Sequence, residues 1–579
     1  MEKTVSSYDV VICGAGLAGL TLARQITREL PDVSVLLLEG RGSKTHTSAI
    51  NVGESTVELS GHYLADVLGL RETLENVHLH KLGFRFFFKS GTAPFHTRPE
   101  FGLSEFPPQD SFQIDRARLE ADIKLLNAEQ GIQMLPECQV EEIVLGEGQA
   151  LHTVMFADGI TNQMHTVHCR WVVDAMGRRR FLQKKLGFFE PHDPHFSAAW
   201  FRLKGRYDVT DLVPRDEQEW HSRVKDDKRY HSTNHLMDNG RWVWLIPLGT
   251  GATSIGIVAH EDFFPLAEYN TYEKALLWLE KHEPELRELI GDAQPLDFQC
   301  LRHYSYSAKR AFSIERWACT GDAAVFSDPF LSPGIDQLGF ANTMIVEMIR
   351  RDRENRLDEQ AIETFNHACL SYNAGTVWVI QSSYPIFGET LVVSAKLFWD
   401  IVRGWAMNGP QRFNRIYLDE QKTRALQPVL SRHFLLASRL EKLFKDWVPR
   451  TQRRYTYQFL NYRQMPGVKE LYDSSLQMYT TLDEILHHYQ VALEFFEKLA
   501  QQIFVIALID TMPEMLQQLP SPLWLNAWGI GLNPQRWKAD KLFTPLSAPR
   551  PLDIEEFASK FGIKDIDLSK GRLALSQKA

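Results

Sequence analysis

The 579-residue sequence lacks the charge balance of a nucleic-acid-binding protein. It has 64 lysines and arginines against 73 acidic residues, which gives a formal net charge of -9. Because phosphate backbones are bound mainly through clustered positive charge, nucleic acid is excluded as the main partner.

Cysteine is scarce and is not arranged for metal binding or for disulfide pairing. None of the six cysteines forms a C-x-x-C pair, and no spacing between cysteine and histidine is typical of a metal site. These cysteines are Cys13, Cys138, Cys169, Cys300, Cys319 and Cys369. We therefore expect no bound metal and a reducing compartment.

Long hydrophobic runs are also missing. The longest wholly apolar stretch near the C-terminus, residues 503–509, is too short to cross a bilayer. The N-terminus leads from a short polar segment into an apolar run and has no signal-peptide pattern. We expect a cytoplasmic protein with no transmembrane segment.

The chain is long enough for more than one hydrophobic core, and its character changes near residue 350. Before that point, strand-like runs alternate with helical stretches, as in an α/β protein. After it, glycine becomes rarer and apolar residues follow helical spacing, most clearly over residues 480–511. We predict an α/β core over residues 1–350 and an α-helical C-terminal domain over residues 351–579.

Residues 9–39 carry the pattern of a dinucleotide-binding βαβ unit. Apolar runs at residues 10–13 and 33–38 are typical of buried strands, and residues 17–30 between them have helical spacing. The segment that joins the first strand to the helix is G-A-G-L-A-G. Strand, glycines, helix and strand in this order make the prediction much stronger than the glycine motif alone.

Each residue type in this pattern has a physical task. Gly14 permits the tight turn, Gly16 lets the backbone approach a pyrophosphate, and Gly19 lets helix and strand pack closely. Ala15 lies in the same loop, whose N–H groups face the phosphates. Glu39 ends the second strand, where its carboxylate can accept hydrogen bonds from both ribose hydroxyls.

Two later segments favour FAD over NAD as the dinucleotide. Residues 171–178 read as a strand that ends in a D-x-x-G turn, and another strand leads to Gly321 and Asp322 at a helix start. Both resemble the second and third FAD fingerprints of the aromatic-hydroxylase-like flavoprotein fold. The resemblance implies a Rossmann-type FAD-binding domain in which Asp322 hydrogen-bonds the ribityl chain. It also implies that Gln113 and Arg116 contact the flavin.

The sequence resembles one group on this fold more specifically, the FAD-dependent halogenases. Residues 242–247 match their W-x-W-x-I-P signature, and residues 326–334 match their F-x-x-P-x-x-S-x-G signature. Residues 53–56 resemble their G-E-[SA]-[ST] segment near the flavin, and Lys81 falls at the position of their catalytic lysine. The resemblance covers about residues 8–350. It implies a β-rich substrate-side sheet, inserted at about residues 80–115 and 190–305.

The tryptophan signature and the lysine also have plainer interpretations. The signature residues suit one face of a buried strand, and that face can keep the substrate away from the flavin. They are Trp242, Trp244, Ile246 and Pro247. Lys81 can be a solvated surface lysine, but it precedes the apolar run at residues 84–88. If it is buried there, its pKa is depressed and it can take part in chemistry.

By the resemblance, Ser332, Pro333 and Gly334 frame the halide. Backbone N–H groups of a turn at a helix start bind an anion without a competing carboxylate. The same residues can instead form an ordinary helix start, with Ser332 as N-cap and Pro333 as the first helical residue. These two interpretations are compatible.

The resemblance implies a reaction in which reduced FAD, supplied by a separate flavin reductase, uses O₂ to convert chloride or bromide into hypohalous acid. This oxidant reaches Lys81, which either hydrogen-bonds it or becomes a haloamine, and an aromatic substrate is then substituted. Members that act on tryptophan have a Glu where this chain has Leu331. A phenol or pyrrole is therefore favoured over free tryptophan, because its own heteroatom activates the ring. Asp336 can replace that Glu as a base, or can simply be a carboxylate at a helix start.

Two other functions remain open from the sequence. A single-component aromatic hydroxylase would share the FAD fold and oxidise NAD(P)H, and a non-catalytic flavin-binding partner would use the helical region for docking. That region is rich in aromatic residues that suit walls around an aromatic substrate. Its basic cluster of Arg450, Arg453 and Arg454 can dock an acidic carrier protein that holds the substrate, or can be a solvated basic turn.

Overall fold

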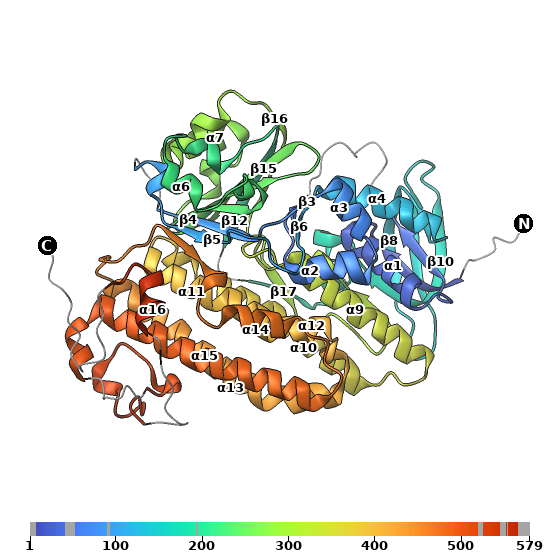
Figure 1. Cartoon of the computed structure of the whole chain (residues 1–579). Coiled ribbons are helices and arrows are strands. Elements are labelled where there is room, and N and C mark those ends of the chain that lie inside the picture. The colour runs from blue at the N-terminus through green and yellow to red at the C-terminus, as the bar shows by residue number, and fades with distance from the viewer. Residues whose placement is uncertain are drawn as a thin grey trace, which may run out of the picture.

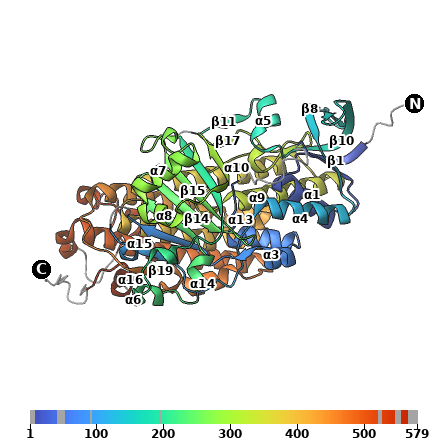
Figure 2. The same cartoon turned by 90° about the horizontal axis from the view of Figure 1, so that it is seen from above.

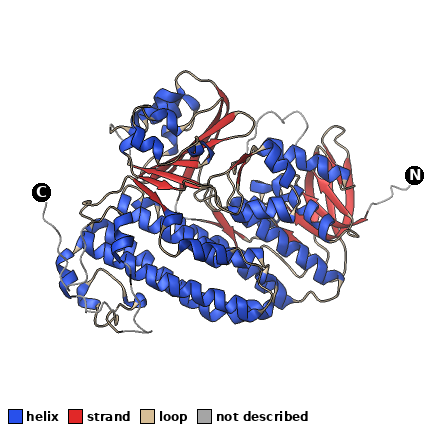
Figure 3. Cartoon of the chain, in the orientation of Figure 1, coloured by secondary structure: helices blue, strands red, loops and turns tan. Residues whose placement is uncertain are grey.

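Two β-sheets lie side by side over a layer of long C-terminal helices (Figure 1). The computed structural model describes residues 7–40, 52–89, 93–192, 195–518, 525–544, 552 and 554–564. Figure 3 shows that strands are concentrated in the two upper lobes and that helices form the lower layer. The predicted architecture is confirmed: an α/β fold with a Rossmann-type first sheet, a second sheet and a helical C-terminal region.

The first sheet is mostly parallel and carries the predicted βαβ unit. Its strands run in the order β7-β2-β1-β10-β9-β8, and β18 pairs with β10. The strands are β1 (Ser7–Cys13), β2 (Val35–Leu38), β7 (Gln133–Leu135), β8 (Cys138–Val144), β9 (His152–Asp158), β10 (Met164–Asp174) and β18 (Trp317–Cys319). Strands β1 and β2 are short continuous apolar runs because helices cover the sheet and bury them.

Three helices pack beside this sheet and hold the nucleotide-binding elements. They are α1 (Leu17–Glu29), α4 (Arg116–Glu129) and α9 (Gly334–Arg353). The strands and helix predicted at residues 10–13, 17–30 and 33–38 are confirmed as β1, α1 and β2. Since β1, β2 and β10 run parallel, their carboxyl ends meet at one edge, which is where such sheets bind ligands.

The second sheet is mixed and has the order β16-β12-β15-β14-β13-β4-β5-β19. Its strands are β4 (Phe84–Phe88), β5 (Glu100–Gly102), β12 (Phe196–Lys204), β13 (Thr233–Asp238), β14 (Arg241–Pro247), β15 (Ala252–His260), β16 (Pro295–Leu301) and β19 (Phe459–Asn461). The buried strand that the sequence suggests at residues 242–247 is confirmed as β14. One face packs on α7 (Tyr272–His282) and α8 (Pro284–Ile290), and the other faces the helical layer (Figure 2).

Long helices dominate the chain after residue 350. They are α10 (Glu359–Gln381), α11 (Thr390–Arg403), α13 (Glu420–Trp447) and α15 (Leu482–Thr511), with shorter helices α12 (Gly409–Phe413), α14 (Val468–Ser475) and α16 (Ile554–Lys560). The helix predicted at residues 480–511 is confirmed as α15, and Thr481 and Glu484 form a capping box at its start. Within the described residues, no helix is both long and apolar enough to cross a membrane.

The helical region is joined to both sheets. Its strand β19 pairs in parallel with β5, so that residues far apart in the sequence share one sheet. On the side of the first sheet, Arg415 lies 2.9 Å from Glu29 at the end of α1. The helical region is therefore in contact with both sheets.

The remaining elements are short connections around these layers. They include α2 (Glu58–His62), the π-helical turn Tyr63–Val67, α3 (Arg71–Val77), β3 (Leu79–His80), β6 (Phe112–Gln113), α5 (Phe181–Lys185), β11 (Phe189–Pro191), α6 (Gln218–Ser222) and β17 (Tyr306–Ala308). The segment from α2 to β4 matters most for function, because it crosses from the first sheet to the second and carries Lys81.

Candidate active site

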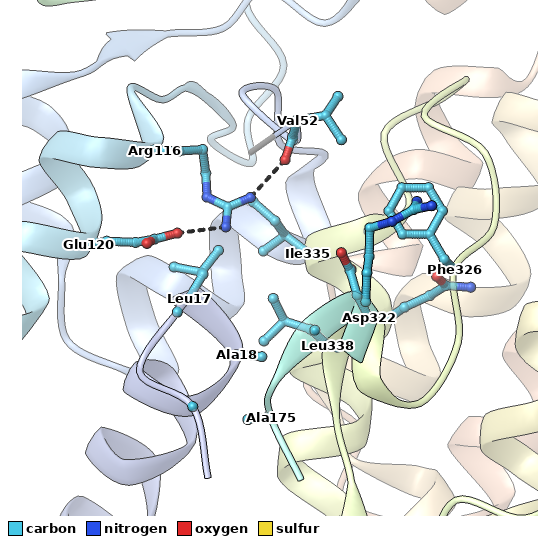
Figure 4. A pocket seen from close by; sticks show the side chains of 18 of the residues that line it. Leu17, Ala18, Val52, Arg116, Glu120, Ala175, Asp322, Phe326, Ile335 and Leu338 are labelled. Atoms are coloured by element: carbon cyan, nitrogen blue, oxygen red, sulfur yellow. Dashed lines mark hydrogen bonds and ion pairs between the residues drawn. The ribbon is translucent and has the colours of Figure 1, made fainter. Parts of the chain in front are cut away.

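A cavity of about 790 Å³ lies at the carboxyl edge of the first sheet and extends to the second sheet. Most of the residues predicted to bind cofactor or halide line it. They are Gly14, Ala15, Gly16, Glu39, Arg116, Gly321, Asp322, Ser332 and Gly334. Figure 4 shows this cavity, with Leu17 and Ala18 of α1 on one side and Asp322 on another. We refer to it as the flavin cavity.

The glycines of the first loop have different surroundings. A Cβ added to Gly14 would lie 2.4 Å from the carbonyl oxygen of Ala175, and one added to Gly19 would lie 1.9 Å from the oxygen of Gly14. Both positions therefore need glycine for close backbone packing. A Cβ added to Gly16 would meet nothing within 4 Å. Gly16 faces open space at the start of α1, the place where a pyrophosphate fits a Rossmann loop.

The other predicted cofactor residues offer polar groups to the same space. Glu39 lies at the end of β2, where its carboxylate pairs with Lys124 of α4. Arg116 donates hydrogen bonds to the carbonyl oxygen of Val52, at 2.9 Å, and to Glu120, at 2.7 Å (Figure 4). Asp322 is exposed to the cavity, although it follows a buried strand. The cavity offers Glu39 to a ribose, the loop of Gly16 to a pyrophosphate and Asp322 to a ribityl chain, so it fits FAD.

Gln113 lies apart from this lining. It is fully buried next to Ser55, and its Oε1 accepts a hydrogen bond from Thr233 at 3.1 Å. Pro247 and Pro333 also lie outside the lining, and Gly19 is packed behind it. These four residues therefore do not line the cavity but support the residues that do.

The tryptophan signature forms one wall of the flavin cavity. Trp242, Trp244 and Ile246 alternate along β14, so all three point to the same face and line the cavity. Both indoles are 2% exposed and are fixed by hydrogen bonds, from Trp242 to the Tyr384 hydroxyl and from Trp244 to the Ser254 hydroxyl. The two tryptophans are core residues and cavity wall at the same time.

The segment from Phe326 to Gly334 turns sharply where it enters α9. Leu331 and Ser332 both have left-handed backbones, with φ of 62° and 50°. Such strain in residues other than glycine is often found at functional sites. Helix α9 begins at Gly334, one residue later than expected. The Ser332 hydroxyl does not cap this helix and instead donates a hydrogen bond to Ser55 Oγ at 3.1 Å. The first N–H groups of α9 have no partner inside the helix and can bind an anion.

Lys81 is a buried lysine with a polar and an aromatic contact. Its side chain is 1% exposed, and Nζ donates hydrogen bonds to Ser55 Oγ at 2.8 Å and to the Thr56 carbonyl oxygen at 2.7 Å. Nζ also lies 3.9 Å from the centre of the Phe84 ring. Burial lowers the pKa of Lys81 to about 7, and the negative charge of Glu58 opposes this shift. The ammonium and the amine are therefore both accessible near neutral pH.

A row of hydroxyl groups connects Lys81 with the flavin cavity. The Ser55 Oγ atom lies at its centre, within hydrogen-bonding distance of Lys81, Ser332 and Thr233. Ser55, Ser332 and Thr233 line the cavity, whereas Lys81 lies behind Ser55. Three segments that are distant in the sequence thus meet within one hydrogen-bonded row.

A second network contains residues that the sequence analysis did not identify. The buried Asp328 accepts hydrogen bonds from the hydroxyls of Tyr304, at 2.6 Å, and Tyr384, at 2.9 Å. Burial raises the pKa of Asp328 to about 6. Tyr384 in turn accepts from Trp242, so the network fixes the tryptophan wall. The Asp-Pro pair inside the second signature was a possible signal, but nothing in the sequence points to Tyr384.

His235 was also missed. It lies on β13 opposite Trp244, lines the flavin cavity and stacks on Phe86 with ring centres 4.6 Å apart. Burial lowers the pKa of His235 to about 3, so its ring is neutral at physiological pH. Alternation along the strand was the only signal that could have found it, because Thr233 and His235 lie on one face.

Asp336 does not reach the flavin cavity. It is buried, accepts a hydrogen bond from the Tyr372 hydroxyl, and lies 3.5 Å from Arg412. These partners favour the plainer interpretation of a paired carboxylate near a helix start. In the basic cluster, Arg453 pairs with Glu389, which neutralises part of its charge.

Comparisons with known proteins agree with this geometry. The model of the family described as "FAD binding domain" matches residues 7–335, more than half of the chain. The chain therefore belongs to the FAD-binding domain family.

The relatives define the class more narrowly. A flavin-dependent halogenase, chlA of Dictyostelium discoideum, is 23% identical over 459 residues, 74% of this chain and 73% of the relative. A 1H-pyrrole-2-carbonyl-[peptidyl-carrier protein] brominase of Pseudoalteromonas luteoviolacea is 26% identical over 57% of this chain and 74% of its own length. This chain is an FAD-dependent halogenase, with FAD as its cofactor and a halide ion as reactant.

The solved structures extend the likeness of fold into the helical region. Halogenase PltM, in complex with phloroglucinol and FAD, superposes with a TM-score of 0.58 at 17% identity. The match covers 88% of this chain and 97% of that chain. The fold that this chain shares with PltM thus extends into the helices after residue 350.

Proposed function

We propose that this enzyme halogenates an electron-rich aromatic ring, phenolic or pyrrolic, and that Lys81 delivers the halogen. The observation that carries this proposal is the hydroxyl row, in which Ser55 joins the Ser332 turn to Lys81. A halide held at the start of α9 and a lysine behind Ser55 lie at the two ends of one polar path. A simple hydroxylase has no need for a buried lysine at the end of such a path.

The bound cofactor would supply the oxidising chemistry: reduced FAD with O₂ turns chloride or bromide into hypohalous acid. We propose that a separate flavin reductase supplies the reduced FAD. Residues of this chain that would hold FAD are Gly14, Ala15, Gly16, Glu39, Arg116 and Asp322. The halide would bind at the turn of Ser332 and Gly334. The Ser332 N–H donates to the Pro329 carbonyl oxygen, so the available N–H groups are those of the first turn of α9, from Gly334 onward.

The remaining residues direct the oxidant rather than make it. Trp242 and Trp244 form an apolar wall that keeps water and the substrate from the cofactor. Ser55 and Ser332 offer hydroxyls along the path, and Lys81 as an ammonium hydrogen-bonds the hypohalous acid and activates its oxygen as a leaving group. The nearby carboxylate of Glu58 favours this charged form of Lys81.

The substrate class follows from what this chain has near the halide turn. Leu331 is apolar, so this position provides no base for an unactivated ring. A phenol or pyrrole activates its own ring and does not need one there. Two kinds of relative support this class: the brominase is named for a pyrrole on a carrier protein, and PltM was solved with phloroglucinol.

The proposal is tested with Lys81→Ala under supplied reduced FAD, O₂ and either chloride or bromide. Wild-type enzyme should give products with the mass shift of the added halogen from phenols or pyrroles in a panel that includes tryptophan. The variant should lose at least about 100-fold of that product, because the directing group is gone. Its FAD affinity should stay unchanged.

Exposed Lys204→Ala is the matched control and should behave as wild type. Regioselective product from Lys81→Ala at the wild-type rate would contradict the role of the lysine. Oxygenated products without halogen, together with steady NAD(P)H consumption, would instead identify a hydroxylase.

A further inference from the structure

A second cavity lies on the other side of Lys81 from the flavin cavity. It has a volume of about 20 Å³ and shares no lining residue with the flavin cavity. Its lining includes Glu58, Trp405, Tyr462, Arg463 and Tyr472. Four of these five residues come from the helical region, whereas Cys369 is the one described residue of that region that lines the flavin cavity. We refer to it as the acceptor cavity.

The backbone on both sides of Lys81 connects it to the acceptor cavity. Lys81 Nζ donates to the carbonyl oxygen of Thr56, and Glu58 begins α2 two residues later. On the other side, Gly83 has φ of 90°, and a Cβ added there would lie 3.3 Å from the Tyr462 hydroxyl. Lys81 therefore lies between the hydroxyl row and the acceptor cavity.

Among the described residues that line this cavity, Glu58 is the one acidic residue. No other side chain in the described part of the chain donates a hydrogen bond to its carboxylate. The backbone N–H of Glu58 does, which leaves lone pairs for a further donor. Burial raises the pKa of Glu58, and the charge of Lys81, the hydrogen bond from the Glu58 backbone N–H and the charge of Arg463 oppose this shift. The carboxylate also acts electrostatically on Tyr462 and Tyr472, whose pKa values it helps to raise.

The other walls suit a flat ring. Trp405 and Tyr472 pack with ring centres 4.1 Å apart, and the Arg463 guanidinium lies 4.8 Å from the centre of the Tyr472 ring. The cavity as it stands has room for about one water molecule. Trp405 lies on the π-helical turn Gly404–Asn408, and such turns are frequent at functional sites. Binding of a ring therefore requires Trp405 and this turn to move aside.

We propose that Glu58 is a catalytic residue that accepts the acidic O–H or N–H proton of the substrate in the acceptor cavity. This inference rests on the proposed function, because Lys81 must present hypohalous acid to the same ring. The base comes from α2, and it replaces the one that the halide turn lacks at Leu331. Glu58 binds the most acidic proton of the substrate and so directs the activated ring toward Lys81.

The step balances as follows for a phenol. Glu58 takes the O–H proton while a ring carbon forms a bond to the halogen and the halogen–oxygen bond breaks. The departing oxygen takes a proton from the Lys81 ammonium and leaves as water. The ring C–H proton then passes to the Lys81 amine, and the carbonyl oxygen of the dienone regains a proton from Glu58. The net change is phenol plus hypohalous acid to halophenol plus water.

The test compares resorcinol with 1,3-dimethoxybenzene, which has the same ring but no acidic proton. Binding to the full-length, FAD-loaded enzyme is measured by tryptophan fluorescence, and halogenated product is measured by mass. Wild type should bind resorcinol at least about tenfold more tightly than the ether, because only resorcinol donates to a charged acceptor. Glu58→Gln should abolish that preference and lower resorcinol turnover about 100-fold.

Exposed Glu72→Gln on the neighbouring helix α3 is the matched control and should keep the wild-type preference. Hypohalous acid is trapped separately with monochlorodimedone, so that its formation is measured without the substrate. If wild type forms none, the proposed function fails and this inference with it. If it forms normally, either of two results overturns the role of Glu58 alone: a wild-type enzyme without preference, or a Glu58→Gln variant that keeps it. An equal loss with both compounds would show a structural role and would also overturn it.

Discussion

The two cavities on either side of Lys81 are built from different parts of the chain and in different ways. The flavin cavity is large, at about 790 Å³, and its floor is made of backbone and glycine at the ends of parallel strands. The acceptor cavity is small, at about 20 Å³, and is closed by large aromatic side chains from the helical region. A cavity built from backbone can bind the same cofactor in many proteins. A cavity built from side chains can be changed by substitution to fit a particular substrate ring.

The largest expected effect comes from placing a side chain in the flavin cavity, whose floor is built from backbone. Gly16→Val keeps an extended backbone that valine accepts, and its side chain enters the open space. We expect FAD to bind at least about 100-fold more weakly, a loss of about 2.7 kcal/mol, because the pyrophosphate can no longer approach. FAD affinity is measured by fluorescence titration.

Gly375→Val in α10 is the control, since a Cβ there also meets nothing within 4 Å. It should leave the affinity for FAD unchanged. Wild-type affinity in Gly16→Val would mean that the cofactor does not lie over this loop.

The neutral His235 in the wall of the flavin cavity predicts a loss of stability in acid. An unfolded histidine takes up a proton below about pH 6.5, whereas folded His235 does so only near its pKa of about 3. Between these values the unfolded state binds more protons, so stability falls as the pH falls. At pH 5 this amounts to about 2 kcal/mol, or roughly 30-fold in the unfolding equilibrium.

Urea unfolding of wild type and His235→Phe at pH 7.5 and pH 5 measures this effect. Wild type should lose about 2 kcal/mol more than the variant between the two pH values. His487→Phe, at an exposed position on α15, should keep the wild-type difference. The same pH dependence in His235→Phe as in wild type would argue against a neutral buried ring.

The pH dependence of halogenation distinguishes two roles for the lysine that separates the cavities. If Lys81 acts as an ammonium, product formation in single-turnover assays should fall above its pKa of about 7. Well above that pH the fall should approach about tenfold per pH unit, because the protonated fraction does. Flavin reoxidation, followed in the same samples, should not show this fall.

A rate that rises through pH 7 would contradict the ammonium role. It would favour the alternative in which the free amine is halogenated. The sign of the slope near neutral pH therefore decides between the two chemical roles.

The smallest expected effect comes from enlarging the acceptor cavity. Trp405→Ala removes the largest side chain from its wall. We expect KM for a bulky phenol to fall about threefold relative to KM for resorcinol. Removing the indole makes room for the larger ring, and the few contacts that are lost contribute little binding energy. Trp528→Ala, outside both linings, should leave the ratio unchanged. An unchanged ratio in Trp405→Ala would mean that this cavity does not select the substrate.

The same contrast explains what could be predicted from the sequence. The βαβ unit and β14 were predictable because their backbone geometry requires glycine, alternation or apolar runs at fixed spacing. Lys81 and Ser332 were found by their motifs, but their meeting at Ser55 depends on three segments that only the fold brings together. The long helix α15 was predictable from periodicity and its cap.

The acceptor cavity could not be predicted in the same way. Tyr462 and Trp405 are separated from Glu58 by more than 300 residues, and no local pattern links them. The Tyr384 hydroxyl likewise reaches Asp328 only through the packing of the helical layer on the second sheet. Side chains that meet through tertiary packing carry no periodic or spacing signal of their own.

The pairing of β19 with β5 has a practical consequence for engineering this enzyme. Residues Phe459–Asn461 complete the edge of the sheet that also carries the strand after Lys81. Grafting a foreign helical half onto the N-terminal half would leave the backbone N–H and C=O groups of β5 on the β19 side without their partners. Chimeras should therefore exchange individual helices or turns, such as Gly404–Asn408, and keep the native strand in place.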